Sequence, residues 1–387
     1  MRKIVAGRGF AGLAARAGGL VLLATAIVTV AACSPTAAPT PTAAAAKPAA
    51  GAPTTAAAPA KAAGPSTVIR VGCSDPEGSS SPALTIGKFA ELATKKSNGE
   101  LDVKAFYTSL GVEQSLLEAV KVGSVDAGQI TTANAARFTD AFTMFDLPFL
   151  VKNDAALSSL FKTTDIGKKL AAQFEKDAGV KVLLWMSHGF DATPNSADVQ
   201  TRNKELRVPA DIKGLKIRTN SSPVALAVVK AWGGNPTPVD WGQLYSAMQQ
   251  GVVDGTLGSP MVPYTSIKLQ EVTKHYLAIG AMTNNLPLYI NQKKFDSLTP
   301  SQQKAILDAA AETEAFSQEA ARDLVKKSTA DVEKAGVKIY TPKGAELAEW
   351  TSIREPVWKQ IASEMQGKID LSVAETIYKS DLGASKR

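Results

Sequence analysis

Residues 210–255 read ADIKGLKIRTNSSPVALAVVKAWGGNPTPVDWGQLYSAMQQGVVDG, and this stretch decides the fold class. Residues 215–220, LKIRTN, predict a β-strand, and residues 223–232 predict a helix. Residues 236–255 predict a second helix that runs into a turn. Strands that alternate with helices indicate an α/β fold.

The same pattern occurs nearer the N-terminus. Residues 68–72 predict a strand, residues 82–97 a helix that stops near Asn98 and Gly99, and residues 101–109 a second strand. Residues 113–130 predict an amphipathic helix, a short turn and a third strand. This order implies parallel pairing with right-handed crossovers.

The rest of the chain extends this architecture. Residues 180–187 and 286–295 predict strands, and residues 301–335 predict one long amphipathic helical region that starts at Thr299 and Pro300. We expect two α/β lobes, formed by residues 67–188 with 284–323 and by residues 189–283 with 324–387. A cleft between them is the expected ligand site, because ligands bind beyond the carboxyl ends of strands in such sheets.

The first 66 residues predict targeting rather than a folded domain. Gly7, Gly9 and Gly12 have the spacing of a dinucleotide-binding fingerprint, but no strand precedes them and no acidic residue occurs before Asp75. A basic head and an apolar run instead predict a signal peptide over residues 1–32. Cys33 then resembles a bacterial lipoprotein cleavage site, and residues 33–66 form an Ala-, Pro- and Thr-rich tether. An ordinary signal peptide that happens to contain a cysteine is the alternative.

Composition excludes several classes of protein. The formal net charge is +7 over 387 residues, but only about +1 remains after residue 66, so nothing favours nucleic acid as a partner. Cys73 lies in an apolar run and is predicted to be a small buried side chain rather than a nucleophile. His188 and His275 lack the spacing of metal ligands. We therefore expect no metal, no cofactor and no second run long enough to span a bilayer.

From residue 68 to about residue 366 the chain resembles the solute receptors of tripartite ATP-independent periplasmic (TRAP) transporters, of the dicarboxylate-receptor type. Residues 210–255 carry the strongest match, and GKFAELATKKSNGELDVKAFY, LLEAVKVGSVD and FDLPFL match in order. The resemblance implies a two-lobed periplasmic-binding-protein clamshell with long C-terminal helices. It also implies capture of an organic acid for a sodium-coupled permease with a small and a large membrane subunit.

The resemblance points to Arg218 as the residue that holds the ligand carboxylate, through a bidentate pair that lysine cannot copy. The alternative is a surface arginine in a salt bridge. Trp241 occupies the position of an aromatic residue against the ligand, or else packs within its lobe. Asn134, and Asp75 or Ser81, lie where family pockets gather polar contacts, although helix capping and turn formation explain such residues equally well.

Two departures from the family pattern bear on the ligand. Asp191 stands where many members carry a second ligand-binding arginine, and residues 256–260 read TLGSP instead of a segment with a ligand-binding asparagine. Asp191 either accepts hydrogen bonds from an ammonium or hydroxyl groups of the ligand, or pairs with a lysine or with Arg218. The first case predicts an amino acid or hydroxy acid as ligand.

We therefore expect a receptor that closes over its ligand and is not an enzyme. One rival is a secreted hydrolase or isomerase that uses Asp191 and another acid as an acid–base pair. Another is a receptor that serves a signalling protein instead of a permease.

Overall fold

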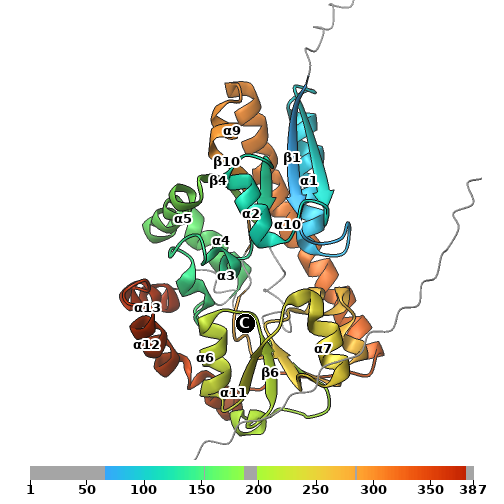
Figure 1. Cartoon of the computed structure of the whole chain (residues 1–387), viewed down its shortest axis with the longest axis vertical. Coiled ribbons are helices and arrows are strands. Elements are labelled where there is room, and N and C mark those ends of the chain that lie inside the picture. Colours follow the sequence, from blue (N-terminus) through green and yellow to red (C-terminus); the bar gives the residue numbers. More distant parts are fainter. Residues whose placement is uncertain (1–65, 152, 187–197, 284–285, 381–387) are drawn as a thin grey trace, which may run out of the picture. The chain divides into compact units, whose positions relative to one another are not determined.

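The computed structural model describes residues 66–151, 153–186, 198–283 and 286–380, drawn as coloured ribbons in Figure 1. Internal contacts divide the chain into Met1–Ala60 and Lys61–Arg387, and every described residue belongs to the second unit. The predicted signal peptide, nearly all of the tether, Cys33 and Asp191 lie outside the described residues. Two β-sheets and the helices around them make up the described part.

The first sheet has five strands in the order β2-β1-β3-β10-β4. Their bounds are Thr67–Cys73 (β1), Leu101–Tyr107 (β2), Ala127–Gln129 (β3), Val180–Met186 (β4) and Leu286–Asn291 (β10). β1 pairs parallel with β2 and β3, which confirms the prediction, whereas β10 pairs antiparallel with β3 and β4. The strand predicted over residues 286–295 is too long. The Asn291 side chain accepts a 2.9 Å hydrogen bond from Lys294 N, which ends β10 and starts helix α9 (Gln292–Asp296).

The second sheet has six strands in the order β11-β9-β5-β8-β6-β7. Their bounds are Val199–Thr201 (β5), Lys216–Thr219 (β6), Asn235–Pro238 (β7), Gly255–Leu257 (β8), His275–Leu277 (β9) and Lys338–Tyr340 (β11). β6 pairs parallel with β7 and β8, and β5 is antiparallel to both of its neighbours.

The helix predicted over residues 236–255 begins later than expected. Pro236 and Pro238 lie in β7, at the edge of the sheet, where a residue without an N–H group is tolerated. A 3₁₀ turn at Trp241–Gln243 follows, and helix α7 spans Leu244–Gln250. The turn therefore projects from the carboxyl end of β7 instead of lying within a helix.

The remaining helices surround the two sheets (Figure 1). Their bounds are Ser81–Lys96 (α1), Glu113–Lys121 (α2), Thr132–Ala135 (α3), Asp154–Thr163 (α4), Asp165–Ala178 (α5), Pro223–Ala231 (α6), Met261–Ser266 (α8), Pro300–Lys334 (α10), Gly344–Thr351 (α11), Arg354–Glu364 (α12) and Leu371–Lys379 (α13), with 3₁₀ turns at Thr143–Asp146 (η1), Pro209–Ile212 (η2) and Leu269–Glu271 (η4). None of the helices in these described ranges is long and apolar enough to cross a bilayer.

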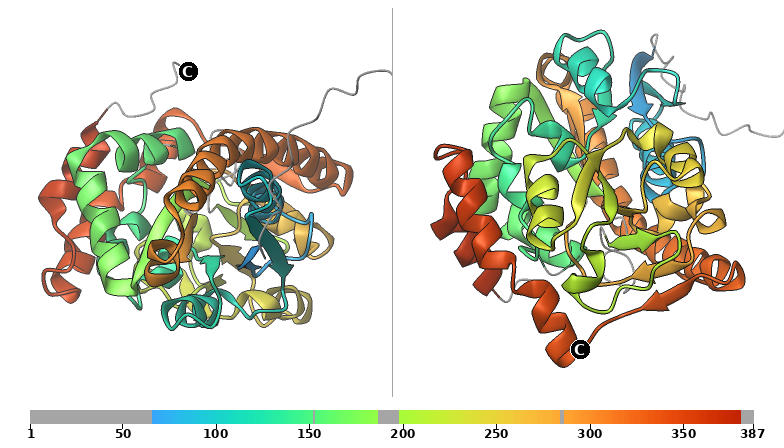
Figure 2. Two further views of the ribbon diagram at one scale, coloured as in Figure 1. Left: turned by 90° about the horizontal axis from the view of Figure 1, so that it is seen from above. Right: turned by 60° about the horizontal axis from the view of Figure 1, so that its bottom comes forward.

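Helix α10 contributes to two hydrophobic cores. It begins at Thr299, whose hydroxyl accepts from Gln302 N at 3.3 Å while the Gln302 side chain accepts from Thr299 N at 3.1 Å, as predicted for a helix start there. Ile306 packs in the core of the first sheet, and Val332 packs in a core with Tyr276 of β9. The left view in Figure 2 shows α10 as a long, curved orange helix. The division into lobes at residues 323 and 324 stays a prediction.

Cys73 ends β1 as a small buried side chain, 1% exposed, which confirms the sequence prediction. Burial is the main cause that raises the pKa of its thiol to about 12, and the charge of Asp75 adds to this effect. The thiolate, which is the reactive form, is therefore suppressed.

A strand–helix–strand–helix–strand unit occurs once in each sheet. The first copy runs from β1 to β3 and the second from β6 to β8, with the same strand order and parallel directions. In each copy an aspartate before the third strand accepts the backbone N–H of the first strand. Arg70 N donates to Asp126 Oδ2 and Lys216 N donates to Asp254 Oδ2, both at 2.8 Å. These bonds fix the register of the first strand in each sheet.

Candidate functional site

Arg218 lies near the carboxyl end of β6 and is only 4% exposed. Its partners in register are Thr237 of β7 and Thr256 of β8, so the three side chains share one face of the sheet. Parallel strands of this kind present their carboxyl ends to ligands in α/β proteins. The local sequence thus places a cation at the edge where a ligand is expected.

The guanidinium of Arg218 has few partners. Its Nε donates to Val239 O at 2.8 Å, and its central carbon lies 5.6 Å from the centre of the Trp241 ring. No ion pair within the described residues includes Arg218. Burial lowers the pKa of Arg218 to about 10, with a smaller opposing effect from Asp240. The group remains cationic at neutral pH, in a setting that disfavours an unpaired charge.

Trp241 is half-buried in the turn between β7 and α7. Its ring and the guanidinium of Arg218 are within cation–π range. These two are the predicted site residues that the structure brings together. Tyr245, one turn later, donates its hydroxyl to Glu271 at 2.9 Å, and Trp232 is a buried core residue.

Asp75 and Ser81 lie in and after the loop that follows β1, in the first sheet. Asp75 accepts a 2.5 Å hydrogen bond from Ser80, and burial raises the pKa of its carboxyl. Ser80, rather than Ser81, caps α1. The Ser81 side chain is fully buried and its hydroxyl lies 3.5 Å from Ser317 O of α10. Ser81 therefore packs a helix interface.

Asn134 belongs to a polar cluster around Glu113, a residue that the sequence analysis did not single out. Glu113 Oε2 accepts from Asn134 Nδ2 at 2.7 Å and from both the N–H and the hydroxyl of Thr131 at 2.9 and 2.8 Å. Burial raises the pKa of Glu113 despite these hydrogen bonds. Asn134 is not among the contacts of Arg218 within the described residues. An acid at the first position of α2 was the available signal, but it is common at helix starts.

Buried polar side chains continue the row of Arg218 across the second sheet. Thr256 pairs with Gln200 of β5, which in turn pairs with Tyr276 of β9. Gln200 Nε2 donates to Ser259 O at 2.9 Å, whereas its Oε1 is buried without a hydrogen-bond partner in the described part of the chain. Nothing in the sequence pattern singled out Gln200, because β5 is only three residues long.

Asp146 connects the end of η1 to the start of α6. Its carboxylate accepts from Ser222 Oγ at 2.7 Å and is 3% exposed. Burial raises the pKa of Asp146 to about 6. Ser222 lies between β6, which carries Arg218, and α6. The bond therefore joins the segment that follows β6 to η1, which lies far away in the sequence.

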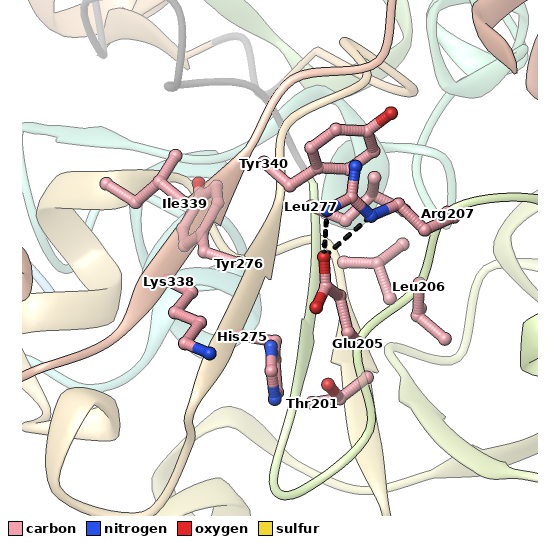
Figure 3. Close-up of a pocket in the computed structure, with 11 residues that line it drawn as sticks. Thr201, Glu205, Leu206, Arg207, His275, Tyr276, Leu277, Lys338, Ile339 and Tyr340 are labelled. Atoms are coloured by element: carbon pink, nitrogen blue, oxygen red, sulfur yellow. Dashed lines mark hydrogen bonds and ion pairs between the residues drawn. The ribbon is translucent and has the colours of Figure 1, made fainter.

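A separate pocket of about 270 Å³ lies between β11, β9 and the segment after β5 (Figure 3). Its lining includes Glu205, Arg207, His275, Lys338 and Tyr340, and none of the predicted site residues. It is therefore a different site from the one around Arg218.

A mixed α/β chain with two sheets, and with a buried arginine near a strand end that has no ion-pair partner among the described residues, has the features of a solute-binding protein. Residues 77–365 match the family model DctP, bacterial extracellular solute-binding protein, family 7. The chain belongs to this family, which places it outside the cytoplasm and favours a receptor over the predicted enzyme rival.

Two curated relatives illustrate the similarity. The 2,3-diketo-L-gulonate-binding periplasmic protein YiaO of Escherichia coli is 32% identical over 258 residues, which cover 66% of this chain and 75% of that protein. The C4-dicarboxylate-binding periplasmic protein DctP of Rhodobacter capsulatus is 29% identical over 284 residues, 72% of this chain and 81% of that one.

Solved structures share the fold. The sugar acid binding protein DctPAm of Advenella mimigardefordensis, in complex with galactonate, aligns with a TM-score of 0.71 at 25% identity, covering 81% of this chain and 97% of that chain. A TRAP periplasmic solute binding protein from Sulfitobacter, with bound β-D-galacturonate, aligns with a TM-score of 0.72 at 20% identity, covering 81% and 100%. These alignments agree with the two-lobed architecture predicted from the sequence.

Proposed function

We propose that this protein is the extracytoplasmic receptor of a TRAP transporter and captures a small organic acid by its carboxylate. The observation that carries the proposal is the buried guanidinium of Arg218, which lacks an anionic partner among the described residues. An anionic ligand compensates such a charge. The ligands named for the similar proteins, which include C4-dicarboxylates, galactonate and galacturonate, are all carboxylic acids.

The contacts of Arg218 define how a carboxylate binds. Because Nε already donates to Val239 O, the two terminal nitrogens are left to form an end-on pair of hydrogen bonds with both carboxylate oxygens. Lysine offers a point charge and cannot reproduce this pair. A neutral ligand leaves the charge unpaired, which costs roughly 1–3 kcal/mol or more.

The other proposed contacts follow from position. Trp241 packs an apolar face of the ligand beside the guanidinium. Asp191, which lies outside the described residues, accepts from hydroxyl groups or an ammonium of the ligand. Asp75, Ser81 and Asn134 are the weaker candidates, because each already has a hydrogen-bond partner in the protein.

Capture is proposed to work by closure. The two proposed lobes, residues 67–188 with 284–323 and residues 189–283 with 324–387, close over the bound acid. The membrane permease subunits then recognise the closed form. Only a ligand that binds the closed state more tightly than the open one shifts this equilibrium.

The N-terminal segment supplies the proposed anchor. Cleavage after residue 32 exposes Cys33 for lipid attachment, and residues 33–66 act as a tether between lipid and receptor. Mass spectrometry of the mature N-terminus tests this assignment, since an unmodified start at another residue contradicts it.

Ligand identity and the role of Arg218 are tested together. Mass spectrometry of the purified protein identifies the co-purifying acid, and calorimetry then compares wild type, Arg218→Lys and Arg218→Ala. We expect the alanine variant to bind at least about 100-fold more weakly and the lysine variant to lie between the two. Unchanged affinity in Arg218→Ala contradicts the proposal, and chemical conversion of the acid by the wild type favours the enzyme rival.

A further inference from the structure

The pocket in Figure 3 lies on the face of the second sheet opposite to Arg218. In register, Lys338 of β11, His275 of β9 and Thr201 of β5 form one row. The row of Arg218 passes through Tyr276, whose side chain points the other way because neighbouring strand residues alternate. A ligand in this pocket therefore does not compete with one at Arg218.

An ion pair lies on one wall of the pocket. Arg207 contacts Glu205 Oε1 through Nε and a terminal nitrogen, both at 2.6 Å, and its guanidinium carbon lies 4.0 Å from the centre of the Tyr340 ring. Trp350 Nε1 donates to Arg207 O at 2.9 Å. Glu205 thus lines the pocket, and its other carboxylate oxygen makes no ion pair within the described residues.

The opposite wall supplies an unpaired cation. Lys338 takes part in no ion pair of the described residues. Figure 3 shows Lys338 and Glu205 on either side of the His275 ring. Opposite charges therefore face each other across the pocket without contact.

His275 places an uncharged ring between these charges. Its Nδ1 is buried and has no hydrogen-bond partner in the described part of the chain. Burial lowers the pKa of His275, so the ring is neutral at pH 7 and one of its nitrogens accepts. The lining also has an apolar part, with Val199, Leu206 and Leu277 all at most 3% exposed.

We propose that this pocket binds a free α-amino acid with a small apolar side chain. The ligand ammonium donates to Glu205, the carboxylate pairs with Lys338, and the side chain lies against the apolar part of the lining. A simple acid meets repulsion from Glu205, and a simple amine meets repulsion from Lys338. Only a zwitterion complements both walls.

The test uses a protein with Arg218→Ala, so that binding at the first site does not contribute, and His188→Gln, which leaves His275 as the single histidine. The imidazole signals of His275 are followed by NMR during titration with L-leucine, 4-methylpentanoate and 3-methylbutylamine. We expect a saturable shift with leucine and at least about tenfold weaker responses to the two analogues, which each lack one charged group.

Lys338→Gln and Glu205→Gln each weaken the leucine response about tenfold or more. Lys343→Gln, an exposed lysine outside the lining, leaves it unchanged. The proposal is overturned if leucine gives no saturable shift, if either analogue matches leucine, or if Lys338→Gln has no effect. The Lys338 variant decides the case even if Glu205→Gln disturbs the segment held by Arg207.

Discussion

The units β1–β3 and β6–β8 have the same topology but differ at one corresponding position. Arg70 and Lys216 are the strand residues whose N–H groups donate to the aspartates. Gly72 of β1 and Arg218 of β6 each lie two residues further along the strand, so they occupy corresponding positions. Leu116 lies over Gly72 so closely that a Cβ there falls 2.4 Å from Leu116 Cδ1. In one unit, apolar packing closes the space above the strand. In the other, a guanidinium occupies the corresponding position.

The difference shows that the scaffold does not determine the chemistry. Asp126 and Asp254 hold both first strands by the same backbone bond, and both strands lie between two parallel neighbours. We propose that Arg218 gives the second unit its anion site, whereas Gly72 offers the first unit no side chain at this position. A site is in this sense an addition to a fold and not a property of it.

The largest expected effect comes from removing the charge that distinguishes the two units. Arg218→Met abolishes the ligand-induced rise in melting temperature, yet stabilises the ligand-free protein by about 1–4 kcal/mol, because an apolar side chain replaces a buried unpaired charge. Calorimetric unfolding with and without ligand measures both. Arg70→Met is the control, and it lowers stability because Arg70 pairs with Asp126 at 3.1 Å. A ligand-free Arg218→Met protein less stable than wild type contradicts the assigned burial cost.

A second effect concerns the bond that ties the unit of Arg218 to η1. Burial raises the pKa of Asp146 to about 6 from its ordinary 3.8, so the folded state binds the proton more tightly than the unfolded state. This contribution to stability is present below about pH 4 and is lost as the pH rises through 6, by roughly 2–3 kcal/mol.

Asp146→Asn keeps an oxygen for the Ser222 hydroxyl but removes the titration. We expect the variant to be more stable than wild type at pH 7.5 and nearly equal to it at pH 4. Urea unfolding at each pH measures the free energy of unfolding of both proteins. If the two free energies depend on pH in the same way, the assigned role of Asp146 is wrong.

The smallest effect tests the shared scaffold. Asp126→Ala and Asp254→Ala each leave a strand N–H without its acceptor, which destabilises by about 1–2 kcal/mol. Only Asp254→Ala also weakens ligand binding, since it loosens the strand that carries Arg218. Urea unfolding measures the stability of each variant, and calorimetry under conditions where both variants are folded measures its affinity for the ligand. Equal loss of affinity in both variants shows that the units are not independent.

Much of the fold was predictable because its signals are local. The parallel strands of the first unit, and α10 with its cap at Thr299, follow from periodicity and capping chemistry. Strands β5, β8, β9 and β11 were not predicted, because each has three residues, too few to show alternation, and β3, which is equally short, was predicted only as the end of the segment 113–130. Their positions depend on pairing with strands far away in the sequence.

The site was predictable only in part. Arg218 and Trp241 were singled out by the family resemblance of residues 210–255, whereas the Asp146 to Ser222 bond joins residues 76 positions apart. Glu113 and Gln200 acquire their partners through tertiary contacts, and residue type alone does not reveal these. Ser81, a candidate for a polar contact with the ligand, has its hydroxyl 3.5 Å from Ser317 O of α10, a contact that the sequence pattern does not reveal.

One helix serves both cores. Ile306 and Val332 belong to the same 35-residue helix but are buried in different cores. Unfolding of either core would therefore expose apolar side chains of the helix that also stabilises the other core. We therefore expect heat denaturation to be a single cooperative event, and a cut in the middle of α10 to destabilise both cores.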